Sequence, residues 1–189
     1  MLKKLKQSNK GEGFTIIEVM IVLAIAALIL LIVLLAVPAL QRSSRNTQRK
    51  NDVSAIAAAV ANVITDNNGQ VPADLAVNAT DASSLLVCSV GGGSPASTTP
   101  ACGAGPTENA KLGYYKPTSI YLETSSGTQP VVGTTAGATT ITTDSVTIDT
   151  GYTCGTTAGT IGAASPRSAA IFYAIESGSS TNNLQCIEQ

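Results

Sequence analysis

The sequence predicts an α+β fold in which one long N-terminal helix packs on a C-terminal antiparallel β-sheet. Three observations predict it: an uncharged apolar segment, an apolar stripe at helical spacing after it, and a Thr-, Ser- and Gly-rich second half with short alternating runs. We expect a leader, an apolar helix half, an amphipathic helix half, an αβ-loop region and a sheet with a disulfide-bounded C-terminal loop. In that order, these parts cover residues 1–13, 14–40, 41–69, 70–111 and 112–189.

The apolar segment is long enough to cross a membrane. It carries no charge from Val19 to Leu40, and as a helix it would span roughly 33 Å, against a hydrocarbon core of about 30 Å. A cleaved secretory signal peptide is the alternative, but its apolar region is usually about 7–15 residues long and ends at a small-residue site. Here the small residue, Gly13, precedes the segment, so we expect a membrane span.

The helix is expected to continue to Thr65 and to be amphipathic in its second half. One apolar stripe recurs at helical spacing, with Asp52, Ser54, Asn62 and Thr65 outside it. The stripe consists of Val53, Ile56, Ala57, Val60, Val63 and Ile64. Because this half has only one apolar face, it should lie on a sheet.

Pro38 lies inside this helical stretch. It removes one backbone hydrogen bond and crowds the carbonyl four residues before it, so we expect a bend or a locally loosened turn near Leu34 to Pro38. A helix that ends at Val37 is the alternative.

The remainder is expected to be mostly β-structure in antiparallel hairpins. A short helix is predicted around Asp81 to Val87. The predicted strands are Leu112 to Lys116, Ser119 to Thr124, Thr139 to Thr143, Ser145 to Asp149, Ala169 to Glu176 and Leu184 to Ile187.

The composition argues against an enzyme. The chain contains no His, which removes the commonest general base and the commonest transition-metal ligand. Charged residues make up 12% of the chain, and beyond the basic leader the balance is mildly acidic, which offers no attraction for nucleic acid. No Gly-rich piece has the spacing of a phosphate loop. We therefore expect no catalysis, no metal, no cofactor and no specific nucleic-acid site.

The four cysteines are expected to form disulfides, which implies an oxidising compartment. No C-x-x-C pair and no His are present to build a zinc site. Three pairings are open. We favour Cys88 with Cys102 and Cys154 with Cys186, because each closes a local loop; buried free thiols are the alternative.

The most specific motif lies where the leader meets the apolar helix, in the run Gly13-Phe14-Thr15-Ile16-Ile17-Glu18-Val19. This run resembles the processing site of type IV prepilins. In that family a membrane-embedded prepilin peptidase cuts after the Gly, and the new N-terminal Phe is methylated. The resemblance implies a cut between Gly13 and Phe14, N-methylation of Phe14, an assembly role for Glu18 and the lollipop architecture of pilins.

The function that this resemblance implies is structural. The mature chain would polymerise through its helix into an extracellular pilus, a homo-oligomeric helical filament for adhesion, twitching motility or DNA uptake. The implied partners are a prepilin peptidase and methyltransferase, an assembly platform protein and an ATPase. Before assembly the subunit would lie in the bacterial cytoplasmic membrane as a single-pass protein with its N-terminus inside. A pseudopilin of a type II secretion system and a single-pass surface binding protein remain as alternatives.

Physical reasoning also assigns a role to Glu18. A carboxylate at the start of an uncharged span is costly if left unpaired in lipid. A cut after Gly13 creates an α-amino group at Phe14, which a neighbouring helix could present to Glu18. The alternative is a solvated Glu18 that marks the polar end of the span.

Overall fold

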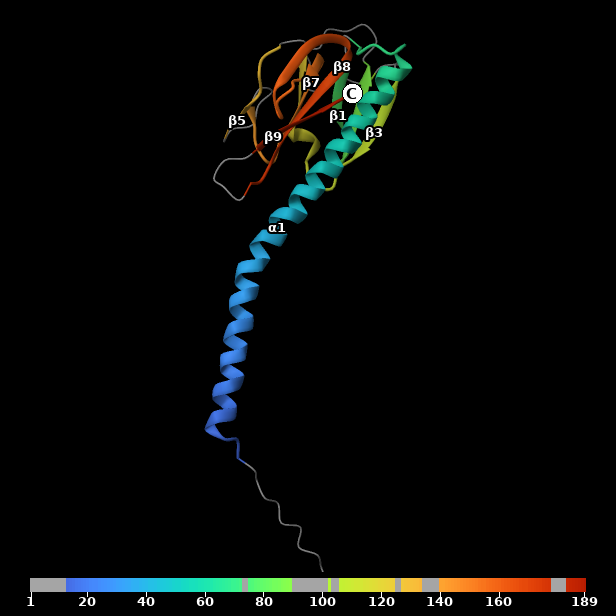
Figure 1. The fold of residues 1–189 in the computed structure, drawn as a ribbon. Helices are drawn as coiled ribbons and strands as arrows, with labels where there is room; N and C mark the ends of the chain where they lie inside the picture. Colours follow the sequence, from blue (N-terminus) through green and yellow to red (C-terminus); the bar gives the residue numbers. More distant parts are fainter. Residues whose placement is uncertain are drawn as a thin grey trace, which may run out of the picture. The chain divides into compact units, whose positions relative to one another are not determined.

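The structure is a computed structural model that describes residues 13–72, 75–89, 102, 106–124, 127–133, 140–177 and 183–189. The chain divides into two compact units, one ending at Gln41 and the other running from Arg42 to Gln189. A single helix, α1 (Ile16–Asp66), is shared between them and continues through Pro38. The alternative of a helix end at Val37 is therefore wrong (Figure 1).

Among its described residues, the first unit consists of residues 13–15 and the apolar part of α1 up to Gln41. Its large apolar side chains are exposed from Phe14 to Leu40. Among the described residues, this helix alone is long and apolar enough to cross a membrane. A helix with apolar side chains on every side needs lipid or other helices around it.

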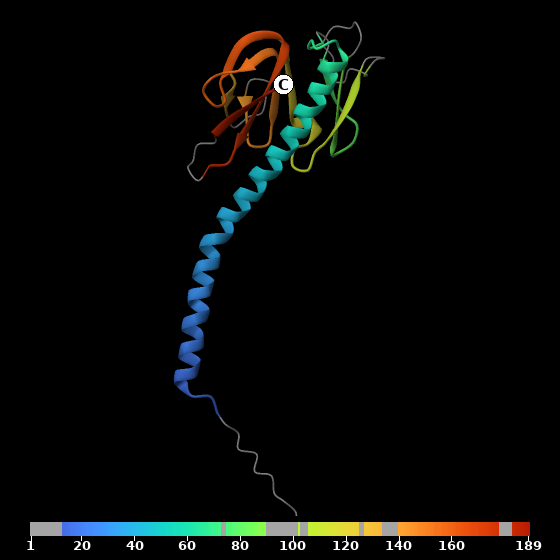
Figure 2. The same ribbon diagram turned by 45° about the vertical axis from the view of Figure 1, so that its right-hand side comes forward.

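The second unit contains two larger sheets and one small one. The four-stranded sheet has the order β4-β7-β8-β9 and consists of β4 (Ile120–Thr124), β7 (Val146–Cys154), β8 (Ile161–Ile175) and β9 (Asn183–Glu188). The three-stranded sheet consists of β1 (Leu75–Ala79), β2 (Ser84–Ser89) and β3 (Thr107–Lys111). The small sheet pairs β5 (Val131–Val132) with β6 (Thr140–Ile141), and a 3₁₀ turn, η1 (Pro117–Ser119), precedes β4. Within this unit the last part of α1 lies over both larger sheets (Figures 1 and 2).

The core of the second unit forms where α1 meets these sheets. All six residues of the predicted apolar stripe are buried, so that prediction is confirmed. They pack in one cluster with Leu85 and Val87 of β2, Ile148 of β7 and Ile171 of β8, among others. A smaller cluster, which contains Ile141 of β6 and Phe172 of β8, covers the opposite face of the four-stranded sheet.

The prediction of a C-terminal β-sheet is confirmed, but two strand pairs are parallel and not antiparallel as predicted. β4 pairs with β7 in parallel, and so does β5 with β6, whereas β7, β8 and β9 pair antiparallel. Alternation of side chains is the same in both arrangements, so the pattern along a strand does not specify its direction.

Two local predictions were wrong. The segment from Asp81 to Val87 is not a helix: Asp81 accepts hydrogen bonds from the backbone N–H and the hydroxyl of Ser83, which makes the turn of the β1–β2 hairpin. Residues 112–116 are not a strand, because Asp52 takes the backbone N–H groups that a neighbouring strand would need. Strands β1, β2, β3 and β5 were not predicted.

Candidate processing and assembly site

The N-terminus of α1 is closed by three reciprocal hydrogen bonds between Thr15 and Glu18. The Thr15 backbone N–H and hydroxyl both donate to Glu18 Oε2, at 2.9 and 2.7 Å, and the Glu18 N–H donates to Thr15 Oγ1 at 3.4 Å. This is a capping box, with a Thr just before the helix and a Glu in its first turn. The carboxylate is therefore held at the helix end, where the helix dipole also favours a negative charge.

Thr15 was not among the predicted site residues. The signal for it was present, because Thr-x-x-Glu before an apolar run is the sequence signature of a capping box. The structure thus gives Glu18 a partner within its own chain.

The residues predicted for processing and assembly, Gly13, Phe14 and Glu18, lie within six consecutive positions of the chain. Phe14 is 88% exposed, and together with Glu18, Val19, Val22 and Leu23 it lines an open groove on the helix. The groove is apolar except for the carboxylate. A group that binds there would meet apolar surface and one negative charge.

Gly13 has no structural reason to be a glycine. A Cβ added at this position would meet nothing within 4 Å. Its φ angle is not among the positive ones, whereas those of Gly69, Gly151 and Gly159 are. Packing and backbone conformation therefore leave the residue type at position 13 unrestricted.

A second set of polar contacts fixes α1 to the four-stranded sheet, and we call Arg45, Asn46, Arg49 and Glu176 the clamp. Arg45 binds the Glu176 carboxylate with both Nε and Nη2, at 3.0 and 2.6 Å, and Arg49 Nη2 donates to the same carboxylate at 2.7 Å. Asn46 donates from Nδ2 to the Glu176 carbonyl and accepts from the Glu176 N–H, at 2.8 and 2.9 Å. Glu176 follows the last residue of β8, so the clamp joins the helix to the end of that strand.

Arg49 is the buried member of the clamp. Its side chain is 1% exposed and also donates to the Thr143 carbonyl, to Asn46 Oδ1 and to the Tyr114 hydroxyl. The guanidinium lies 4.3 Å from the centre of the Tyr114 ring, a cation–π contact. Hydrogen bonds from Arg45 and Arg49 lower the pKa of Glu176 to about 2, so the carboxylate is charged at any physiological pH.

Asp52 lies one turn further along α1 and is buried, although it lies outside the apolar stripe. It is 5% exposed and accepts hydrogen bonds from the backbone N–H groups of Gly113, Tyr114 and Tyr115, at 2.8, 2.7 and 2.8 Å. These bonds provide partners for the buried carboxylate oxygens and for the backbone N–H groups of the segment that links β3 to η1.

The clamp changes the charge balance just beyond the apolar helix. Four cations follow the span, which weakens the positive-inside signal: Arg42, Arg45, Arg49 and Lys50. Two of them, Arg45 and Arg49, are paired with Glu176 inside the second unit. Among the described residues, Arg42 and Lys50 are the exposed cations left on this part of α1.

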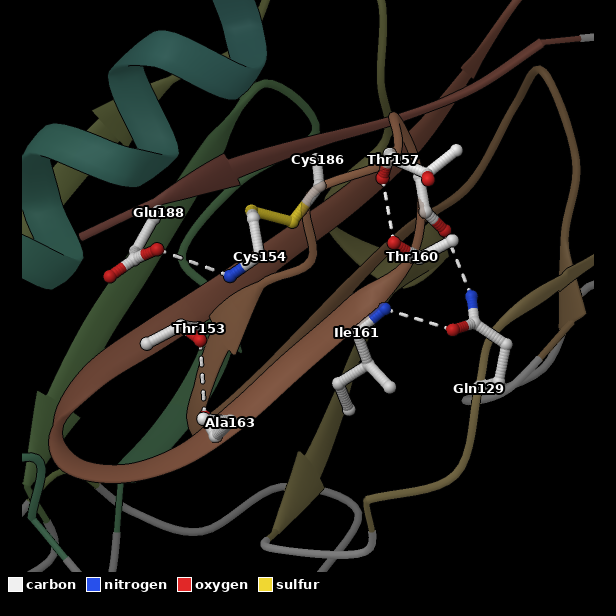
Figure 3. The surroundings of a disulfide bond; sticks show 10 residues. Gln129, Thr153, Cys154, Thr157, Thr160, Ile161, Ala163, Cys186 and Glu188 are labelled. Carbon is white, nitrogen blue, oxygen red and sulfur yellow. Dashed lines mark hydrogen bonds between the residues drawn. A yellow bond between two sulfur atoms is a disulfide. The ribbon is translucent and has the colours of Figure 1, made fainter.

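Two disulfides join Cys88 to Cys102 and Cys154 to Cys186, the pairing favoured from the sequence. The second ties the end of β7 to β9, and the Cys154 N–H also donates to Glu188 of β9 (Figure 3). Beside it, Gln129 donates to the Gly159 carbonyl and accepts from the Ile161 N–H, each at 2.9 Å.

In the part of the chain that the structure describes, no group of three or more His, Cys, Asp or Glu side chains is placed to hold a metal ion.

Comparison with known proteins gives one match. Residues 8–34 match the model of the prokaryotic N-terminal methylation motif. The matched segment contains Gly13, Phe14, the capping box and the first half of the apolar helix. No significant match was found among curated proteins or among solved structures.

Proposed function

We propose that this chain, whose N-terminus is that of a type IV prepilin-like protein, is a structural subunit of a type IV pilus. The mature chain would assemble through the apolar half of α1, with the apolar helices of many copies packed together and the second unit displayed outside. The observation that carries this proposal is the exposed apolar helix that opens with a single carboxylate, Glu18.

Gly13 supports cleavage at the Gly13–Phe14 bond. The fold does not require a glycine there, so recognition by a peptidase is a reason for its presence. The exposed chain around Phe14 leaves the bond accessible before assembly. Removal of residues 1–13 and methylation of the new terminus would follow, by a prepilin peptidase and methyltransferase.

The charges of the mature terminus explain how copies would find their register. Cleavage turns the Phe14 amide into an α-amino group beside a helix that is otherwise apolar. A neighbouring Glu18 would pair with this amine, and two charges that are each costly in an apolar bundle would offset one another. The capping box holds Glu18 ready at the helix end until that partner arrives.

The second unit is suited to the outside of a filament. Two disulfides indicate an oxidising environment, and the clamp and Asp52 fix the helix to its sheets mainly through the buried side chains of Arg49 and Asp52. A platform protein and an assembly ATPase would supply the work of extension.

Substitution of Glu18 tests this function. Glu18→Leu should still insert in the membrane and be cut after Gly13, because Leu lowers the cost of the span. It should assemble poorly, because the neighbouring amine would enter the bundle unpaired, at a cost of about 3–5 kcal/mol for each subunit. Surface filament yield after shearing is the measurement, beside an immunoblot of processed monomer in the membrane.

Thr15→Val is the matched control. It removes the side-chain half of the capping box but leaves the carboxylate for a neighbouring subunit. Filaments from Thr15→Val and none from Glu18→Leu would support registration by the charge. Normal filaments from a fully processed Glu18→Leu protein would refute that role.

A further inference from the structure

Two carboxylates face each other across the parallel strands β4 and β7. Glu123 and Asp149 are partners in the strand register, so their side chains leave the sheet on the same face and next to each other. Asp149 is 1% exposed, and its Oδ1 has no hydrogen-bond partner among the described residues. A buried carboxylate with an unpartnered oxygen beside a second carboxylate is an unfavourable arrangement while both are charged.

Among the described residues of the neighbouring strands, the one cation is Arg167 of β8, which is exposed and lies in the irregular part of the ladder, outside the register pair of Asp149. On β7 the next residue on this face is Thr147, whose hydroxyl also lacks a partner among the described residues. Tyr121 lies beside Thr147 on β4, and Ala170 and Phe172 lie opposite on β8. Glu188 follows on β9, paired in register with Ala170, and it accepts a hydrogen bond from the Cys154 N–H. The groups that face Asp149 are therefore neutral or acidic.

We propose that Asp149 and Glu123 form a carboxyl pair that holds one proton, and that this proton makes the attachment of β4 to the sheet stronger in mildly acidic than in neutral medium. With the proton in place, Asp149 carries no charge and has a hydrogen to donate to Glu123. Without it, two adjacent carboxylates repel each other at the edge of the four-stranded sheet, where β4 has β7 as its one neighbour. Burial and the charge of Glu123 raise the pKa of Asp149 to about 6, which places the change between mildly acidic and neutral pH.

The carboxyl pair lies where a change of protonation can affect how the two larger sheets are joined. Strand β4 also contacts β1, so it connects the four-stranded sheet to the three-stranded one. Loss of the proton would loosen this connection, while β7, β8 and β9 stay held by their antiparallel ladders and by the disulfide between Cys154 and Cys186. This inference is independent of whether the chain forms filaments.

Denaturant unfolding of the full chain in detergent, at pH 5 and pH 7.5 with a chelator present, tests the proposal. An aspartate whose pKa rises from the ordinary 3.8 to about 6 increases the unfolding constant about tenfold between these pH values. Asp149→Asn should remove this tenfold change. Glu188→Gln, which removes the other acidic group on this face, should keep it. An undiminished change in Asp149→Asn would overturn the proposal.

Two further measurements keep the test decisive if Asp149→Asn folds poorly. Carbon NMR of aspartate-labelled wild-type protein should show one carboxyl that titrates near pH 6, and Glu123→Gln should move its midpoint to lower pH. Absence of such a carboxyl would overturn the proposal. So would stabilisation by Ca²⁺ at pH 7.5 that disappears in Glu123→Gln, because the pair would then hold a metal ion in place of the proton.

Discussion

Arg49 of α1 and Glu176 at the end of β8 form an ion pair at 2.7 Å, and the Arg49 side chain is 1% exposed. The arginine is also bonded to a backbone carbonyl, an amide and a phenol, so its donors are directed to fixed partners. A buried charge with this many partners is costly to leave half paired. The pair therefore fixes α1 to the end of β8 within the second unit.

Arg49→Met should destabilise the second unit strongly. The substitution keeps an apolar stem but removes one donor each from the Glu176 carboxylate, the Thr143 carbonyl, the Asn46 amide and the Tyr114 hydroxyl, at a cost of about 3–5 kcal/mol. Denaturant unfolding followed by circular dichroism measures it. Arg45→Met is the matched control: Arg45 lowers the pKa of Glu176 most, yet its side chain is 41% exposed, so solvent screens the pair and the loss should be much smaller. Equal losses would contradict the central role of Arg49.

Asp52→Asn should destabilise the link between β3 and η1. An amide has one acceptor oxygen in place of two, and its NH₂ group would face backbone N–H groups that also donate. The expected cost is about 2–4 kcal/mol, since hydrogen bonds to a charged acceptor are the strong ones. Hydrogen exchange at Gly113, Tyr114 and Tyr115 should accelerate more than exchange in β8. Unchanged exchange at those three amides would contradict the assignment.

The clamp should weaken only in strong acid. The pKa of Glu176 is about 2 in the folded protein and 4.5 ordinarily, so the folded state favours the charged form. Its contribution, roughly 3 kcal/mol, is present above about pH 4.5 and is lost as the pH falls through about 2. Glu176→Gln should abolish this part of the acid dependence in urea unfolding between pH 2 and pH 5. A wild-type protein as stable at pH 2 as at pH 5 would argue against it.

Removal of either disulfide should destabilise the second unit, and the longer loop should matter more. The pairs are separated by 14 and 32 residues, which corresponds to roughly 3 and 3.7 kcal/mol of lost loop entropy in the unfolded chain. Cys154→Ser with Cys186→Ser should also loosen β9, which would then be held by its ladder with β8 and no longer tied to β7. Non-reducing peptide mapping of the wild-type protein checks the pairing first, and a peptide that joins Cys154 to Cys88 would contradict it.

The long helix and its buried stripe could be predicted from the sequence because both depend on local periodicity. Val53, Ile56 and Val60 repeat at the spacing of a helix face, and burial follows from that spacing. The disulfide pairing followed from short loop closures. These features need no knowledge of distant parts of the chain.

The clamp could not be predicted, because a polar residue on a helix does not reveal its distant partner. Arg49 and Glu176 are 127 residues apart, and Asp52 binds backbone groups that carry no sequence signal at all. The parallel pairing of β4 with β7 has the same origin: it joins strands separated by β5 and β6. The Asp81 turn was misread because Asp begins helices and tight turns alike.

The intact mass of the protein in sheared surface filaments tests the central claim most directly. The account predicts a chain that begins at Phe14, is heavier by one methyl group than the unmodified 14–189 sequence, and has all four cysteines oxidised. The same protein in the membrane of a strain without prepilin peptidase should retain residues 1–13. A filament protein that still carries Met1 to Gly13, or a full-length chain confined to the membrane in a strain with the peptidase, would contradict the account.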